Sequence, residues 1–222
     1  MDRVFDGVLF DFDGTLADTM NAHFAAWRKA LSPLGVYLNP DDYFPLEGTP
    51  VPELAKIFSR HIAGVDCASI IRDKENYFVE SSIFAPYPGV LDLVDRLVFA
   101  GISIGIVTAG LKNRIDRSVP AGFLSKFHVV ITGERGGRGK PFPDPYLRGA
   151  RSLQVAPDKC LVVENAPLGI IAAKTAGCYC VAIAATMDSV HLRQADRVFD
   201  SMIDLASKLR TQNHSIMLAA GD

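Results

Sequence analysis

Apolar and polar positions alternate in two rhythms along this chain, and each rhythm predicts its own kind of element. Short continuous apolar runs predict buried strands, whereas apolar positions that recur every three or four residues predict helices. The predicted strands are residues 4–10, 103–107, 129–131, 161–163, 179–183 and 198–199. The predicted helices between them are 90–99, 143–153, 169–176 and 201–209, with a further short helix before residue 129. This alternation predicts an α/β fold with a doubly wound, parallel, Rossmann-like core sheet.

Residues 17–85 interrupt this alternation directly after the first strand. Helical patterns are present there at 23–31, 52–61 and 69–79, with a loop rich in Pro, Asp and Gly at 39–50. A breaker cluster, PYPG at 86–89, ends the interruption. We therefore predict two domains: a core of residues 1–16 and 86–222, and an inserted helical-bundle cap of residues 17–85. The last residues, TQNHSIMLAAGD, predict no element.

Composition and charge narrow the possible partners. The chain has 222 residues, of which 49% are hydrophobic and 22% charged, and its formal net charge is −2. With no basic or acidic block, these values argue against nucleic-acid and membrane-surface partners. No apolar run reaches the length of a membrane span, and the start lacks the apolar region of a signal peptide, so we expect a cytoplasmic protein. Its four cysteines form no CxxC pair and are expected to be free thiols. We expect a monomer, with a weak homodimer as the alternative.

Polar residues that could take part in catalysis or ligand binding follow several of the predicted strands. They are Asp11 and Asp13 after the first strand, Thr108-Ala109-Gly110 after the second, Glu164 and Asn165 after residues 161–163, and Lys140 in the loop GERGGRGKPFPDP. In a parallel sheet, ligands bind at the carboxyl ends of the strands, so these groups are expected to converge.

Phosphoryl transfer is the chemistry that uses this set most economically. A carboxylate nucleophile is repelled by an anionic phosphate ester, and a divalent cation held by carboxylates removes that obstacle. Mg²⁺ prefers oxygen ligands and uses few protein carboxylates. Lys140 and the Thr108 hydroxyl, with the backbone N–H groups of Ala109 and Gly110, are suited to hold the phosphoryl oxygens.

In their order and spacing, these motifs resemble the haloacid dehalogenase superfamily, in its branch of capped phosphatases and β-phosphoglucomutase-like proteins. DFDGT at 11–15 resembles the first motif, Thr108 the second, GKPFPDPY at 139–146 the third and ENAPLG at 164–169 the fourth. The resemblance covers nearly all of the chain before about residue 210.

The resemblance implies a role for each of these residues. Asp11 is implied to be the nucleophile that forms an aspartyl-phosphate, and Asp13 the general acid for the leaving group and the base for the attacking water. Thr108 and Lys140 are implied to bind the phosphoryl group. Mg²⁺ is implied to be held by Asp11, by the backbone carbonyl of Asp13 and by the acidic fourth motif. Many members have Glu-Asp in that motif, whereas this chain has Glu164-Asn165, which leaves less negative charge at the site.

Two cap residues bear on the substrate. His23 resembles a cap-hinge histidine that helps to position the acid/base aspartate in the mutase. The loop at 46–51 contains Glu47 and no basic residue, although a sugar-phosphate mutase needs an arginine there to grip a second phosphate. Some members that act on inorganic pyrophosphate resemble this chain at both Glu47 and Asn165, and a cap carboxylate adds a ligand to Mg²⁺ when the cap closes. These members also tend to have an arginine where Thr49 stands here.

The sequence therefore predicts a Mg²⁺-dependent phosphohydrolase that acts on a small phosphorylated metabolite through an aspartyl-phosphate. Inorganic pyrophosphatase and β-phosphoglucomutase-type sugar-phosphate mutase are the alternative enzymes. A catalytically silent binding protein ranks below them, because none of the residues that the chemistry needs is missing.

Overall fold

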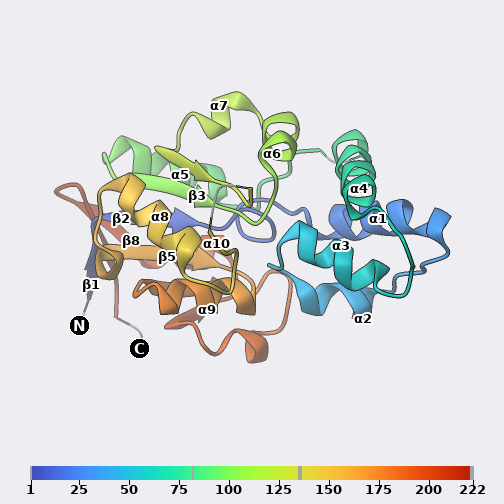
Figure 1. The fold of residues 1–222 in the computed structure, drawn as a ribbon. Coiled ribbons are helices and arrows are strands. Elements are labelled where there is room, and N and C mark those ends of the chain that lie inside the picture. The colour runs from blue at the N-terminus through green and yellow to red at the C-terminus, as the bar shows by residue number, and fades with distance from the viewer. Residues whose placement is uncertain (1, 82, 135–136, 221–222) are drawn as a thin grey trace.

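The computed structural model describes residues 2–81, 83–134 and 137–220. Its main sheet has six parallel strands in the order β4-β3-β2-β5-β6-β7 (Figure 1). These strands are β2 (Gly7–Phe10), β3 (Ser103–Val107), β4 (Val129–Ile131), β5 (Cys160–Glu164), β6 (Tyr179–Ile183) and β7 (Arg197–Phe199). The doubly wound parallel sheet that the alternating pattern predicts is confirmed.

Helices cover both faces of this sheet. They are α5 (Val90–Phe99), α6 (Lys112–Ser118), α7 (Ala121–Leu124), α8 (Asp144–Leu153), α9 (Pro167–Thr175) and α10 (Met202–Lys208). In the central strand, Val8 and Phe10 point into a hydrophobic cluster with α5, α6, α7 and α10, whereas Leu9 points into a second cluster with α8 and α9. Because side chains alternate along a strand, these continuous apolar strands pack on both faces.

A helical unit with its own hydrophobic cluster lies beyond the carboxyl ends of the strands, at the right of Figure 1. It consists of α1 (Met20–Leu31), α2 (Pro40–Tyr43), α3 (Val51–Ser59) and α4 (Cys67–Ser81), with short 3-10 turns at Ser32–Leu34 and Phe44–Leu46. The expected loop at 39–50 therefore contains one helical turn and one 3-10 turn. Asn39 and Asp42 form a capping box there, a signal within the Pro- and Asp-rich stretch. We retain the division into a core and a cap of residues 17–85 as a proposal.

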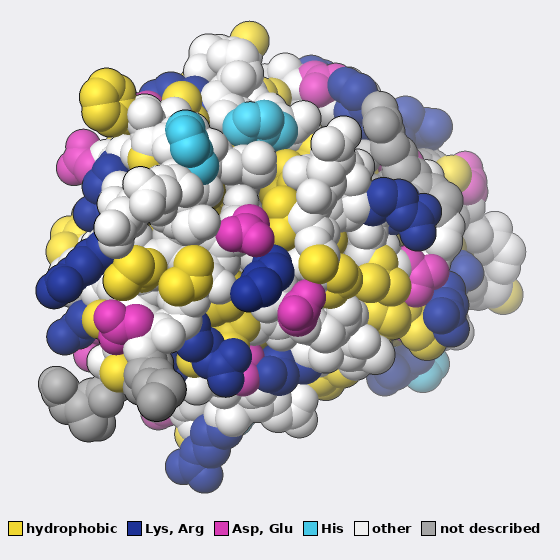
Figure 2. All heavy atoms as spheres, turned by 90° about the vertical axis from the view of Figure 1, so that its left-hand side faces the viewer, with side chains coloured by type: hydrophobic (Ala, Val, Ile, Leu, Met, Phe, Trp, Pro, Cys, Tyr) yellow, Lys and Arg dark blue, Asp and Glu magenta, His cyan; other side chains and the backbone are white. Residues whose placement is uncertain are grey.

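The start and the tail of the chain differ from the prediction. The single strand predicted at 4–10 is two strands, because Asp6 separates β1 (Arg3–Phe5) from β2. β1 pairs antiparallel with β9 (Ser215–Leu218), which forms a hairpin with β8 (Leu209–Gln212), so the tail without a predicted element builds a three-stranded sheet. On the face that carries this small sheet, basic and acidic side chains are intermixed (Figure 2).

Two further expectations concern whole-chain properties. No helix in the described part of the chain combines the length and apolarity needed to cross a membrane. The four cysteines are free thiols; Cys160, Cys178 and Cys180 are buried, and Cys67 is half-buried.

Candidate active site

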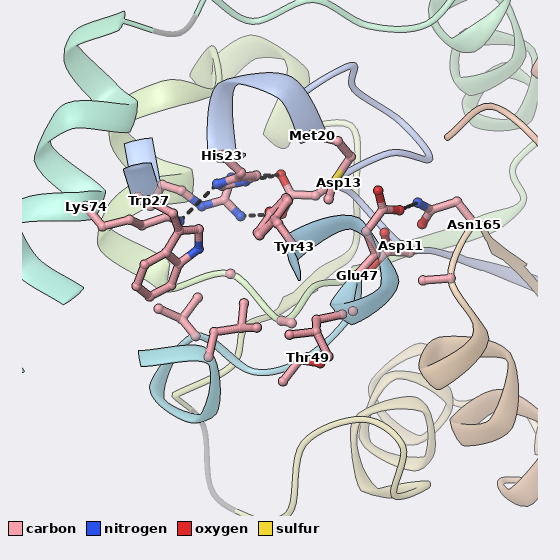
Figure 3. A pocket seen from close by; sticks show the side chains of 18 of the residues that line it. Asp11, Asp13, Met20, His23, Trp27, Tyr43, Glu47, Thr49, Lys74 and Asn165 are labelled. Atoms are coloured by element: carbon pink, nitrogen blue, oxygen red, sulfur yellow. Dashed lines mark hydrogen bonds and ion pairs between the residues drawn. The ribbon is translucent and has the colours of Figure 1, made fainter. Parts of the chain in front are cut away.

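The carboxyl ends of the strands and the inner side of the cap enclose one cavity (Figure 3). Of the predicted site residues, Asp11, Asp13, His23, Glu47, Ala109, Gly110, Glu164 and Asn165 line this cavity. Thr108 and Lys140 line a neighbouring cavity, together with Ala109. The structure thus brings together groups that come from six separate stretches of the chain.

Asp11 follows the central strand and is held by Lys140. The Nζ of Lys140 donates to Oδ1 of Asp11 at 2.6 Å and to Oε1 of Glu164 at 2.5 Å, with all three side chains buried. Burial raises the pKa of Asp11 to about 7 against the opposing effect of Lys140. Burial alone would lower the pKa of Lys140, but the two carboxylates raise it above its usual value, so the lysine is an ammonium ion.

Glu164 is saturated with hydrogen-bond donors. Its Oε1 accepts from Lys140 and from the Tyr146 hydroxyl at 2.7 Å, and its Oε2 accepts from the backbone N–H groups of Asn165 and Ala166. The carboxylate lies against Gly169, where an added Cβ would be 1.6 Å from Oε1. Direct coordination of a metal by Glu164 therefore requires that it exchange one of these donors.

Asp13 lies two residues beyond Asp11 in a different environment. Its Oδ1 accepts from the Thr19 hydroxyl at 2.8 Å and contacts His23 Nε2 at 3.1 Å, and Thr108 Oγ1 lies 3.4 Å from Oδ2. Arg114 donates to both oxygens, with 3.0 Å between Nη1 and Oδ1. Burial would raise the pKa of Asp13, but Arg114 and His23 hold it well below its usual range.

A chain of side chains links Asp13 to the cap helix α4. Lys74 Nζ lies 2.9 Å from His23 Nδ1 and donates to Glu75 Oε1 at 2.8 Å. Because an ammonium group only donates, His23 Nδ1 is the acceptor and Nε2–H donates to Asp13. Burial, and then the charge of Lys74, lowers the pKa of His23 to about 4, so the imidazole is neutral.

Lys74 and Arg114 were not predicted from the sequence. Lys74 had a detectable signal, because Ile70 and Phe78 lie four residues before and after it on the buried face of α4. Arg114 had none, since the polar stretch KNRIDRS is typical of a solvated helix, yet the structure buries Arg114 beside Ile115.

Glu47 reaches from the cap into the core. It is 3% exposed, and its Oε2 accepts from Asn165 Nδ2 at 3.2 Å and from the Thr186 hydroxyl at 2.9 Å. Oε1 is buried without a hydrogen-bond partner in the described residues. Burial raises the pKa of Glu47 to about 7. Thr186, which also was not predicted, connects the carboxylate of the cap to the loop after β6.

Two further features concern substrate binding. The N–H of Gly110 donates to Thr108 Oγ1 at 2.9 Å, so both groups of this proposed phosphate-binding loop are already paired with each other. Beside His23, Glu47, Thr49 and Lys74, the cap contributes an apolar part to the cavity wall, which consists of Met20, Trp27, Tyr43, Leu46, Val51 and Leu54.

A model of the haloacid dehalogenase-like hydrolase family matches residues 8–183. Hexitol phosphatase A of Escherichia coli (strain K12) is 34% identical over 88% of this chain and 91% of its own length. Fructose-1-phosphate phosphatase YqaB of the same organism is 30% identical over 85% of this chain and 97% of its own length. A crystal structure of CbbY from Rhodobacter sphaeroides in complex with phosphate is 30% identical, covers 90% of this chain and 96% of that one, and superposes with a TM-score of 0.81.

Proposed function

Because this chain belongs to the haloacid dehalogenase-like hydrolase family, in its β-phosphoglucomutase-like phosphatase branch, we propose that it is a Mg²⁺-dependent phosphatase of a small sugar or sugar-alcohol phosphate. The chain is a hydrolase of phosphoric esters. The substrate class is proposed from the names of its relatives, which act on hexitol and fructose phosphates.

In the proposed mechanism Asp11 and Asp13 divide the covalent and the proton-transfer chemistry. The Asp11 carboxylate attacks phosphorus, so that an aspartyl O–P bond forms while the ester P–O bond breaks. In its protonated form, a minority because Arg114 and His23 hold its pKa low, Asp13 gives a proton to the leaving oxygen, and it then takes one from the water that hydrolyses the aspartyl-phosphate. Phosphate leaves, and the Asp11 carboxylate is regenerated. Lys140, 2.6 Å from Asp11, orients the nucleophile and supplies positive charge for the phosphoryl oxygens.

The donor chemistry suits Mg²⁺, although no three Asp, Glu, His or Cys side chains within the described residues converge as a preformed metal cage. Four carboxylates, those of Asp11, Asp13, Glu47 and Glu164, line the cavity, and Lys140 contacts two of them, Asp11 and Glu164. Within the described residues Oε1 of Glu47 accepts no hydrogen bond, and the carboxylate ligand atoms are oxygens, as Mg²⁺ prefers. We propose that Asp11, the Asp13 backbone carbonyl, Glu164 and Asn165 hold the ion, with Glu47 joining from the cap. The bound ion supplies charge neutralisation that lets a carboxylate approach an anionic ester.

One observation carries this proposal. Asp11 and Asp13 line the same cap-covered cavity at the carboxyl end of the central strand. Asp11 is held by Lys140, whereas Asp13 is held by Arg114 and His23. Two neighbouring carboxylates with separate partners suit a nucleophile and a proton carrier better than they suit a binding site.

Inorganic pyrophosphatase is the second candidate. The contact between Glu47 and Asn165 favours it, because a carboxylate that reaches across from the cap leaves room for only a small substrate. The mutase is disfavoured, since Lys74 and Arg114, the cations that line the cap side of the cavity, are paired with Glu75 and Asp13.

The test is an assay of the purified chain with Mg²⁺ on a panel of phosphates. The panel contains sorbitol 6-phosphate, fructose 1-phosphate, β-glucose 1-phosphate and pyrophosphate. Phosphate release from a sugar or hexitol ester supports the phosphatase, and release from pyrophosphate alone supports the second candidate. Isomerisation of β-glucose 1-phosphate without phosphate release would support the mutase, and no reaction with any member contradicts the proposal.

A further inference from the structure

Arg114 is a buried cation with no role among the predicted site residues. It is 2% exposed, although it lies on the short polar helix α6. Its Nη1 donates to Oδ1 of Asp13 at 3.0 Å, and its Nη2 donates to Oδ2 of the same carboxylate. Two parallel N–H···O bonds from one guanidinium fix the plane of a carboxylate as well as its position.

The two oxygens of Asp13 differ in how much acceptor capacity they have left. Oδ1 receives Thr19 at 2.8 Å, His23 at 3.1 Å and Arg114 at 3.0 Å. Oδ2 receives Arg114 and only a long 3.4 Å contact from Thr108. Oδ2 has one short contact against three on Oδ1, so it is the oxygen that can take another partner once the long Thr108 contact is released.

The fold leaves a fitted space for this guanidinium. A Cβ added at Gly110 would lie 1.8 Å from Nη2, so the guanidinium occupies the volume of a missing side chain. The guanidinium carbon lies 5.2 Å from the ring centroid of Phe78 on the cap helix α4. On the same helix, Oε2 of Glu75 lies 3.7 Å from Nε. Core and cap therefore both hold the arginine in place.

We infer that Arg114 is a positioning residue for Asp13. Its planar guanidinium, which donates from two nitrogens to the two carboxyl oxygens, turns Oδ2 of Asp13 toward the leaving oxygen of the substrate. This inference rests on the acid/base role proposed for Asp13. Arg114 itself does not touch the reacting atoms. Its contribution lies in geometry, so a residue with the same charge and a different shape does not replace it.

The dependence of the rate on the leaving group separates this role from a merely structural one. An alkoxide leaves poorly without a proton, whereas p-nitrophenolate leaves well without one. We compare p-nitrophenyl phosphate with the sugar or hexitol ester of the panel that the wild type hydrolyses fastest. General acid catalysis contributes about 10²–10⁴-fold to such steps, so Arg114→Gln is expected to lower kcat/KM for the alkyl ester by about 10²-fold. For p-nitrophenyl phosphate, kcat/KM is expected to stay close to wild type.

Arg114→Lys and Glu75→Gln make the test specific. Arg114→Lys keeps the charge and loses the two parallel N–H donors, and Glu75→Gln keeps the arginine but removes the cap carboxylate that lies 3.7 Å from its Nε. Both are expected to show a selective loss on the alkyl ester. Arg117→Gln is the matched control, because Arg117 lies one turn further along α6, is exposed and donates a hydrogen bond to Asn76 of α4 rather than to Asp13. It is expected to leave both reactions unchanged.

Three results would overturn the inference. Arg114→Lys with full activity on the alkyl ester shows that charge alone suffices. An equal loss on both esters in the folded variants, with folding checked by thermal unfolding, shows a structural role. If Arg114→Gln and Arg114→Lys do not fold, Glu75→Gln decides between these outcomes. A wild-type chain that is inactive on every ester contradicts the proposed function as well. An active wild type whose Arg114 variants keep wild-type activity on both esters contradicts only the role of Arg114.

Discussion

Oε2 of Glu47 accepts a hydrogen bond from Nδ2 of Asn165 at 3.2 Å, so a carboxylate of the cap meets an amide of the core at the edge of the cavity. The second oxygen of Glu47 is buried and has no donor among the residues that the structure describes. Leaving a buried acceptor unsatisfied costs about 1–3 kcal/mol. A cation that binds this oxygen removes that cost. Glu47 then supplies the metal site with a negative charge that the neutral Asn165 does not.

Substitution of Glu47 tests its place beside the metal. We expect Glu47→Gln to raise the Mg²⁺ concentration needed for half-maximal activity by about tenfold, the lower range for loss of a supporting partner of a metal site. Calorimetric titration of the protein with Mg²⁺ should show the same weakening without substrate. Glu53→Gln, an exposed glutamate of α3, is the control. Unchanged Mg²⁺ binding in Glu47→Gln would remove Glu47 from the metal site, and a loss confined to pyrophosphate would favour the pyrophosphatase.

The covalent mechanism depends on Asp11. Asp11→Asn keeps the shape of the side chain but removes the nucleophilic charge, so we expect phosphate release to fall by about 10⁴-fold or more. Mass spectrometry of acid-quenched protein should detect a phosphoryl adduct on wild type and none on the variant. Asp41→Asn, at an exposed cap position, should behave as wild type. Full activity in Asp11→Asn would exclude the aspartyl-phosphate.

Removal of the metal should abolish activity reversibly. We expect EDTA to stop phosphate release from every ester, and excess Mg²⁺ to restore it, because the four carboxylates that line the cavity otherwise repel the anionic substrate. Circular dichroism should show that the fold persists, since the hydrophobic clusters of core and cap do not involve the metal. Full turnover in EDTA would argue against metal dependence.

The neutral His23 should make stability depend on pH. The pKa of His23 is about 4 in the folded chain and is 6.5 for an ordinary histidine. Between these values the unfolded chain binds a proton that the folded chain does not, so stability falls as the pH drops from 6.5 toward 4. The free energy of unfolding, measured with urea at pH 7.5 and pH 5, should therefore fall less in His23→Gln than in wild type. An equal fall in both would contradict the prediction.

The terminal hairpin should contribute to stability. Ile216 of β9 is fully buried in the main hydrophobic cluster. We expect Ile216→Ala to lower the free energy of unfolding by about 2–5 kcal/mol, as is usual for a large-to-small change in a core. Gln212→Ala, at an exposed position of β8, should change it little. Urea unfolding of both variants measures the difference, and equal midpoints would mean that the hairpin is dispensable.

Local patterns predicted the core elements well. The strands at Ser103–Val107, Val129–Ile131 and Tyr179–Ile183 were predicted to the residue, because each is a mainly apolar run; the first and third are largely buried, and the edge strand Val129–Ile131 is partly buried. The hairpin in the tail was missed, since its burial depends on β1 at the other end of the chain. The break at Asp6 was missed for the same reason, because it separates strands of two different sheets.

The candidate site was predicted in part. Motif order placed Asp11, Lys140 and Glu164, and the structure brings these three side chains into contact. The partners of Asp13 were harder to predict. Arg114 lies 101 residues away in sequence, and nothing in the polar stretch around it indicates that its side chain is buried. Long-range ion pairs of this kind depend on where the helix packs, which residue periodicity does not reveal.

The small sheet has a consequence for the order in which this chain is made and folded. β1 pairs with β9, and the hydroxyl of Ser215 donates to Asp6 across a sequence separation of 209 residues. During synthesis β1 therefore has no partner in this sheet until β9 has emerged, although Gly7–Phe10 beside it is the central strand of the main sheet. Contacts between distant residues form slowly because a long loop must close first. β1 is thus synthesised early but reaches its paired state only after β9 has been made.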